Sequence, residues 1–103
     1  MIEESTMPYT VNIIVSKPAN AVWFKDVNKQ ANDADIAFVK AQPGFVSWTL
    51  VSAPDVNNYT TAMVFEDKAK YDAMMAARAG TAAYQARLAH RTASGMTINI
   101  QPV

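Results

Sequence analysis

Four stretches of the chain are rich in β-branched and aromatic residues, and two longer stretches carry apolar residues at a helical spacing. The first group predicts strands over residues 10–16, 45–52, 59–66 and 96–101. The second group predicts a long helix over residues 19–42 and a second helical region over residues 68–93. Turn-forming residues occupy residues 53–58, so the two middle strands are expected to form a hairpin.

Both helical regions have recognisable ends and interruptions. The apolar stripe of the first region consists of Trp23, Val27, Ala31, Ala34, Phe38 and Ala41. The polar segment 32–35 weakens its middle and favours a kink or a new N-cap there, and Pro43-Gly44 stops the helix. The second region begins after Asp67, a good N-cap, and is broken at Gly80-Thr81 before it continues to about residue 93.

The element order β-α-β-β-α-β predicts an α+β domain of the ferredoxin-like type, a four-stranded antiparallel sheet with both helices on one face. The 103 residues have room for one domain, residues 9–103, after a flexible N-terminal tail of residues 1–8. The strands carry apolar residues at both parities, as Ile13 and Ile14 show, whereas a sheet face in water usually alternates more cleanly. Two bare faces packed together would bury this surface, which predicts a homodimer.

Charge and composition exclude several classes of function. Nine Lys and Arg balance nine Asp and Glu, whereas nucleic-acid binders and polybasic membrane-surface domains need a basic excess. The lack of cysteine excludes disulfides and thiolate chemistry, and the single histidine, His90, excludes a multi-histidine cluster within one subunit. No metal site is expected, because the acidic pairs Asp33/Asp35 and Glu66/Asp67 are interpreted as helix-terminus residues.

The start of the sequence lacks the basic residues and apolar stretch of a secretory signal, and no apolar run reaches membrane-spanning length. We therefore expect a cytoplasmic protein that binds neither membranes nor nucleic acids.

Three local features give the chain a resemblance to the dimeric α+β barrel superfamily, and within it to antibiotic-biosynthesis-monooxygenase-like domains. The first is the long helix that ends in residues 42–45 (Gln-Pro-Gly-Phe) and runs straight into a strand. The second is the strand that passes through residues 65–67 into a helix carrying Tyr71, and the third is the break at Gly80-Thr81 followed by Tyr84. The likeness spans residues 9–103. It implies a homodimer whose sheets form a barrel, with a pocket in each subunit between sheet and helices.

The family includes cofactor-free oxygenases that act on polycyclic phenols or quinols, and also haem degraders. Asn12 matches the position of an asparagine used by both branches, where it could bind a substrate oxygen or hold dioxygen; an ordinary strand asparagine is the alternative. Met74 and Leu88 stand where the haem degraders need a tryptophan and a histidine. His90 is two residues further on, about 200° around a helix, and is interpreted as a surface histidine. The resemblance therefore implies that no haem or other cofactor is used.

Tyr71 and Tyr84 join Asn12 as candidate catalytic residues, because a buried phenol needs a hydrogen-bond partner and could orient a substrate hydroxyl. The candidate substrate-binding residues are Trp23, Trp48, Met63, Met74 and Leu88, and a core position is the alternative for the tryptophans and methionines. Arg87 or Arg78 could pair with an acidic group of a substrate, but a solvated helix face is the preferred interpretation for both.

The family's geometry points Asn12 toward the helices, where it would share a cavity with at least one of the two tyrosines. On the same strand, however, Val11, Ile13 and Val15 form the more apolar parity. If that parity faces the core, Asn12 points into the dimer barrel instead.

The leading hypothesis is a cofactor-independent monooxygenase-like enzyme for a small aromatic or quinol-type substrate, whose own stabilised carbanion reacts with oxygen in an apolar pocket. The alternatives are a non-catalytic small-molecule-binding or structural dimer, and an isomerase or lactone-processing enzyme of the same fold. The lack of an obvious base favours the binding or structural dimer, whereas the resemblance favours the oxygenase. The expected partners are a second copy of the chain and a small apolar or aromatic molecule.

Overall fold

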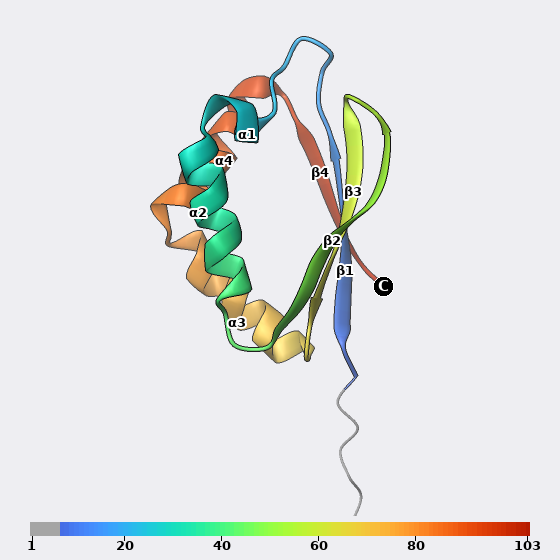
Figure 1. Ribbon diagram of the computed structural model, residues 1–103, viewed down its shortest axis with the longest axis vertical. Helices are drawn as coiled ribbons and strands as arrows, with labels where there is room; N and C mark the ends of the chain where they lie inside the picture. The colour runs from blue at the N-terminus through green and yellow to red at the C-terminus, as the bar shows by residue number, and fades with distance from the viewer. Residues whose placement is uncertain (1–6) are drawn as a thin grey trace, which may run out of the picture.

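The computed structural model describes residues 7–103, which form a four-stranded antiparallel sheet with all helices on one face (Figure 1). The strands are β1 (Tyr9–Ser16), β2 (Phe45–Asp55), β3 (Asn58–Phe65) and β4 (Thr97–Pro102), in the spatial order β2-β3-β1-β4. The predicted ferredoxin-like α+β fold is thus confirmed. The predicted tail of residues 1–8 lies mostly outside the described residues. No helix within residues 7–103 is long and apolar enough to cross a membrane.

The hairpin between β2 and β3 is tighter than the sequence predicted. The expected turn covered residues 53–58, but β2 continues to Asp55 and β3 begins at Asn58. The Asp55 carboxylate accepts hydrogen bonds of 2.8 Å from the Asn57 backbone N–H and from the Asn58 side-chain amide. These hydrogen bonds stabilise the turn, so only residues 56 and 57 separate the end of β2 from the start of β3.

β2 is an edge strand with an irregular register against β3. The pairing shifts between Phe45 and Ser47, between Leu50 and Ser52, and between Ser52 and Asp55. Val46 and Val51 are left without a partner at the first two shifts, and both are exposed. Extra residues of this kind bend and twist the strand that carries them.

The first helical region is shorter than predicted and is interrupted at a different place. It consists of a single turn, α1 (Phe24–Val27), followed by α2 (Lys29–Lys40). The interruption falls at Asn28, not within the polar segment 32–35, because the Asn28 side chain accepts a 3.1 Å hydrogen bond from the Ala31 N–H and so caps α2.

The second helical region follows the prediction closely. It divides at Gly80 into α3 (Lys68–Ala79) and α4 (Ala82–Ser94). Both expected caps are present: Asp67 accepts from the Lys70 N–H at 2.8 Å, and Thr81 accepts from the Tyr84 N–H at 3.2 Å. Side-chain oxygens at these positions satisfy helix N–H groups that have no partner within the helix.

The buried face of α2 is not the apolar stripe that the sequence predicted. Asp35 and Val39 are its buried residues, whereas Val27, Ala34 and Ala41 are exposed. The prediction counted apolar residues only, but the inward face is set by a polar network around Asp35 that is described below. The helix is therefore rotated relative to the expected orientation.

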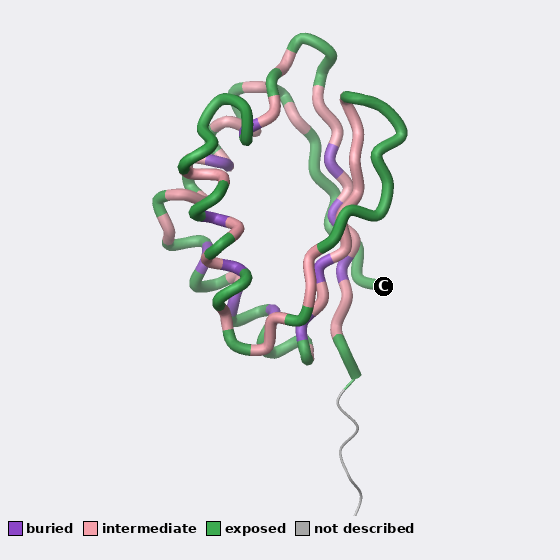
Figure 2. The backbone as a smooth tube through the Cα atoms, in the orientation of Figure 1, coloured by how far each residue is buried: buried purple, intermediate pink, exposed green. Residues whose placement is uncertain are grey.

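Figure 2 shows that buried segments of the helices and of the sheet face one another. The core cluster consists of Val11, Ile13, Val15, Val39, Met63, Phe65, Tyr71 and Met74. Alternate residues of β1 belong to this core, as the two-residue period of a strand requires.

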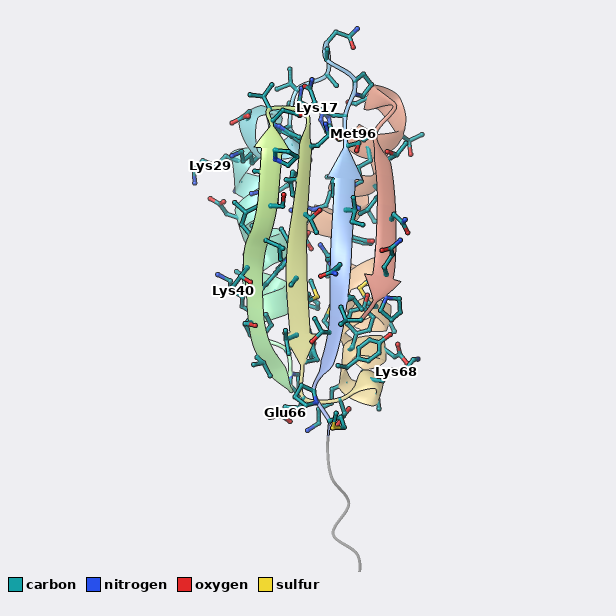
Figure 3. All side chains as sticks on the ribbon, turned by 90° about the vertical axis from the view of Figure 1, so that its right-hand side faces the viewer. Lys17, Lys29, Lys40, Glu66, Lys68 and Met96 are labelled. Carbon is teal, nitrogen blue, oxygen red and sulfur yellow. The ribbon has the colours of Figure 1, made fainter. Side chains whose placement is uncertain are left out.

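The other face of the sheet carries no helix and is turned toward the viewer in Figure 3. Strand alternation and register place on it Thr10, Asn12, Ile14 and Ser16 of β1 and Asn58, Thr60, Ala62 and Val64 of β3. Only two of these eight side chains are large and apolar. This open face is therefore more polar than the sequence analysis expected, because the more apolar parity of β1 faces the helices.

Candidate functional site

A cavity of about 500 Å³ lies between the sheet and the helix layer, a size typical of small-molecule sites. The sheet supplies a mostly apolar wall that includes Ile13, Val15, Trp48, Leu50, Ile98 and Ile100. The helices supply a polar wall that includes Asn32, Arg78, Tyr84, Arg87 and Arg91. The two layers of the fold thus give the cavity two chemically different sides.

A buried ionic network joins three helices behind the polar wall. Asp35 on α2 is 0% exposed, Arg78 on α3 is 4% exposed, and Arg87 on α4 is 8% exposed. Arg78 binds the carboxylate in a bidentate manner, Nε to Oδ1 at 2.8 Å and Nη2 to Oδ2 at 2.7 Å. Arg87 Nε donates to the same Oδ2 at 2.7 Å. A carboxylate with two guanidinium partners is the arrangement that makes a fully buried aspartate tolerable.

The network fixes the charge state of Asp35. Burial by itself raises the pKa of this carboxyl, but the hydrogen bonds and positive charges of Arg78 and Arg87 outweigh burial, so the pKa of Asp35 lies below its ordinary value. Asp35 is therefore an anion near neutral pH. Because both of its oxygens are engaged by guanidinium groups, it is poorly suited to act as a base.

The arginines are held in place by further contacts. Arg87 Nη2 donates to Asn32 Oδ1 at 2.7 Å. The Arg78 guanidinium lies 4.3 Å from the ring centroid of Tyr84 and 5.5 Å from that of Trp48, within the range of cation–π attraction. Arg78 thus joins the rings of Tyr84 and Trp48, and Arg87 is fixed beside it by Asp35 and Asn32.

Arg91, one turn after Arg87 on α4, differs from the other two arginines. It lines the cavity and is half-buried, and it forms no salt bridge or side-chain hydrogen bond with the residues that the structure describes. Burial, followed by the neighbouring positive charge of Arg87, lowers the pKa of Arg91. The positive charge of Arg91 is thus less well compensated than the charges of Arg78 and Arg87, which are paired with Asp35.

One end of the cavity is closed by a contact between the loop before α1 and the hairpin tip. Trp23 Nε1 donates to the Val56 carbonyl at 2.9 Å, and its ring lies 4.9 Å from that of Tyr59. On the sheet wall, Trp48 Nε1 donates to Thr61 Oγ1 at 3.0 Å. Both tryptophans therefore have partners for their polar atoms and present ring surface to the cavity.

Three of the predicted site residues line the cavity: Tyr84, Trp23 and Trp48. Tyr71 does not line it, because its side chain belongs to the core beside Tyr9 and Phe65, where burial raises the pKa of its phenol.

The other predicted lining residues also lie elsewhere. Met63 and Met74 are fully buried in the core, and Leu88 is half-buried outside the cavity lining. His90 is half-buried rather than at the surface, and its Nε2 lies 2.6 Å from the Val22 carbonyl.

The predicted placement of Asn12 is wrong. Val11, Ile13 and Val15 are buried in the core, so the intervening Asn12 lies on the open face of the sheet, where it pairs with Ala62 of β3. It cannot share the cavity with Tyr84. The sequence contained a signal for this placement, because Val11, Ile13 and Val15 are more apolar than the alternate residues of β1.

Sequence reasoning missed the arginines and the aspartate that define the polar wall. Arg78 and Arg87 were expected in solvent, and Asp35 was interpreted as a helix-terminus residue, but all three are buried. One signal was available: Asp35 lies four positions before Val39 and so shares its helix face. The partner arginines are more than forty positions away along the chain, and no local sequence pattern predicts such a pairing.

The sheet order and the helix layer on one face define an α+β fold of the ferredoxin-like type, with a cavity between the two layers. The resemblance noted in the sequence is confirmed at the level of the fold.

Solved structures of known proteins show this likeness directly. SnoaB, a cofactor-independent oxygenase from Streptomyces nogalater, is 21% identical, with a TM-score of 0.61 over 93% of this chain and 90% of that chain. Rv0793 from Mycobacterium tuberculosis is 16% identical, with a TM-score of 0.56 over 91% of this chain and 92% of that chain. A candidate antibiotic biosynthesis monooxygenase from Nitrosomonas europaea is 15% identical, with a TM-score of 0.57 over 99% and 95%. No protein-family model and no curated protein sequence matches the chain. Identities this low establish a shared fold and leave the activity to be argued from the site.

Proposed function

We propose that this protein is a cofactor-independent monooxygenase-like enzyme that acts on a small aromatic or quinol-type substrate. The observation that carries the proposal is the two-sided cavity, with an apolar sheet wall and a cationic helix wall. Such a cavity can hold a flat ring and can stabilise the negative charge that develops when the ring system loses a proton. The cofactor-independent oxygenase among the proteins of the same fold supports this choice.

The proposed reaction needs no external reductant. A quinol-type substrate such as an anthrone loses a proton of its CH₂ group to solvent and becomes an electron-rich carbanion that reacts with dioxygen itself. When its CH₂ group becomes C=O, the substrate gives up four electrons, one oxygen atom enters the product and the other leaves as water. The protein's contribution is then orientation and charge stabilisation. We assign these roles to Tyr84, whose hydroxyl can donate to a substrate oxygen, and to the arginines of the polar wall.

The test is oxygen uptake with an anthrone as substrate, measured against its spontaneous oxidation in buffer. We expect uptake above that background with one quinone formed per dioxygen consumed, and a lower kcat for Tyr84→Phe with little change in the unfolding midpoint. The exposed substitution Lys68→Met serves as the control and should leave the rate unchanged. A rate equal to the spontaneous one in every preparation would contradict the proposal.

A non-catalytic small-molecule-binding protein is the second candidate, and the same cavity favours it. It predicts that an aromatic ligand binds without oxygen uptake. An isomerase or lactone-processing enzyme is less well supported, because it needs a positioned base that returns the proton to the substrate or activates water, and both oxygens of Asp35 are occupied by Arg78 and Arg87. The proposed oxidation needs no such base, since an acidic CH₂ group can release its proton to solvent.

We also propose that the protein forms a homodimer through the open face of its sheet. The face lacks a covering layer in a small domain (Figure 3), and the edge strand β2 beside it exposes apolar side chains at its register shifts, Val46 by 53% and Val51 by 58%. Its threonine and asparagine side chains suit a partly hydrated interface. We expect a buried area of about 1,500 Å² or more in total. Sedimentation should give a dimer at micromolar concentration, and a monomer there would contradict this assembly.

A further inference from the structure

The distribution of arginine in this chain is uneven. The sequence contains three arginines, Arg78, Arg87 and Arg91, and all three line the same cavity. The chain as a whole is neutral, with nine cationic and nine acidic side chains. Two lysines, Lys25 and Lys40, also reach the lining, whereas Asp55 is the one acidic residue in it. Positive charge is therefore concentrated at the cavity of a chain whose formal net charge is zero.

The buried carboxylate does not neutralise this excess. Asp35 carries one negative charge and shares it between Arg78 and Arg87. Asp55 sits at the hairpin and is engaged by Asn57 and Asn58. Neither carboxylate is within ion-pairing distance of Arg91, so within residues 7–103 this guanidinium keeps its donors unpaired. A cation placed in a partly dry wall favours an anionic ligand.

We infer that the cavity binds its aromatic ligand as a monoanion, with the anionic oxygen on Arg91 and the ring against the adjacent apolar residues Val15, Ile98 and Ile100 of the sheet wall. This deepens the proposed function, because it names the ionisation state of the substrate. Arg87 assists from one turn away, and its bonds to Asp35 and Asn32 fix the direction from which it does so. The lowered pKa of Arg91 has the same origin: burial and a like charge, both of which an anion would relieve.

The geometry also explains why the ligand must be aromatic as well as anionic. The apolar wall comes from three different strands, β1, β2 and β4, and Leu50 is 64% exposed although it faces the helix side of the sheet. A ring lying on the β1–β4 part of this wall would cover Ile98 and Ile100, which are 38% and 40% exposed and pair with Val15 and Ile13. Binding therefore combines burial of apolar area with a charge-assisted hydrogen bond.

The test compares 2-naphthoate with its neutral amide, 2-naphthamide, by isothermal titration calorimetry on the full chain at neutral pH. Neither compound has an oxidisable CH₂ group, so binding is measured without turnover, and an absent oxygenase activity would leave this result untouched. We expect naphthoate to bind about tenfold or more tightly than the amide, the factor that one charge-assisted hydrogen bond supplies.

Two variants locate the effect. Arg91→Met should reduce the affinity for naphthoate about tenfold and leave the affinity for the amide nearly unchanged, whereas Arg91→Lys should keep most of the preference because it keeps the charge. Lys68→Met removes the same charge from the far end of α3 and should change neither affinity; Figure 3 shows Lys68 at the opposite end of the molecule from Met96, which lines the cavity. Equal affinities for acid and amide, an unchanged preference in Arg91→Met, or no binding of either compound at millimolar concentration would overturn the inference.

Discussion

Replacing Asp35 with asparagine should destabilise the protein more than any other single polar substitution in α2. The change keeps the shape of the side chain and removes one negative charge from between two buried arginines. Three hydrogen bonds of 2.7–2.8 Å converge on the carboxylate. An asparagine can accept through its oxygen, but its NH₂ group would face a guanidinium donor.

The size of the effect follows from the burial of the three partners. Each charge-assisted hydrogen bond contributes about 1.5–3 kcal/mol, and the recovered desolvation cost of the carboxylate offsets part of that sum. Two arginines that are at most 8% exposed are left facing each other without a counter-charge. Breaking a buried ion pair from one side costs about 3–5 kcal/mol, and we expect Asp35→Asn to fall in this range.

Urea unfolding at pH 7 and fixed protein concentration measures this loss. For a domain of this size the midpoint should drop by about 2 M or more. Asp33→Asn is the matched control, since Asp33 lies on the same helix and also pairs with a cation, Lys29, but its side chain is 54% exposed. Its midpoint should barely move. Similar midpoint shifts for the two variants would refute the reasoning from burial.

The same comparison has a pH dependence whose sign is fixed. Because the pKa of Asp35 is lowered in the folded state, its contribution to stability is present above the ordinary aspartate pKa and is lost as the pH falls through the lowered value. The stability of the wild type and of Asp35→Asn should therefore differ most near neutral pH and converge below about pH 4. A difference that grows on acidification would contradict the assigned charge state.

Gly44→Ala should cost about 1–3 kcal/mol in urea unfolding, because φ is +84° there and a Cβ would lie 2.9 Å from Lys70 Cβ. Gly80→Ala should cost little or stabilise, because φ is −87° and the added Cβ would meet only the Ala77 carbonyl oxygen, at an ordinary contact distance of 3.7 Å. Asn12→Ala should leave the naphthoate affinity within about twofold of wild type by calorimetry, since the residue lies on the open face; a tenfold loss would place it at the cavity after all. Haem should not bind stoichiometrically, because Met74 and Leu88 stand where the haem degraders need a tryptophan and a histidine. An absorbance titration with a sharp Soret shift that disappears in His90→Ala would refute this.

The sequence was sufficient for the features that depend on neighbours along the chain. The hairpin, the N-caps Asp67 and Thr81 and the break at Gly80 are all local, and the structure contains each of them. The interruption of the first helical region was predicted several residues too late. The polar segment 32–35 was the more conspicuous helix-weakening feature, but the cap of α2 is formed by the side chain of Asn28.

The candidate site could be predicted only in part, for a physical reason. Aromatic residues such as Trp48 and Tyr84 can be proposed as site residues from their residue type alone, because they are large and favour partly buried positions. A buried charge does not, since Asp35 is stable inside the protein only when Arg78 and Arg87 arrive from other helices. The cationic character of the helix wall therefore depends on how three helices pack together, which the local sequence does not specify.

The irregular register of β2 has a consequence for how copies of this protein can associate. β4 pairs with β1 in an unbroken register and leaves a regular outer edge, whereas three shifts disturb β2 on the opposite edge of the sheet. Adding β4 of one molecule to β2 of the next would repeat head to tail and build an open filament. The disturbed row of N–H and C=O groups on β2 works against that contact. Pairing of β4 with β4 of a second copy would instead use the same edge of both molecules, and a contact of that kind closes after two copies without propagating.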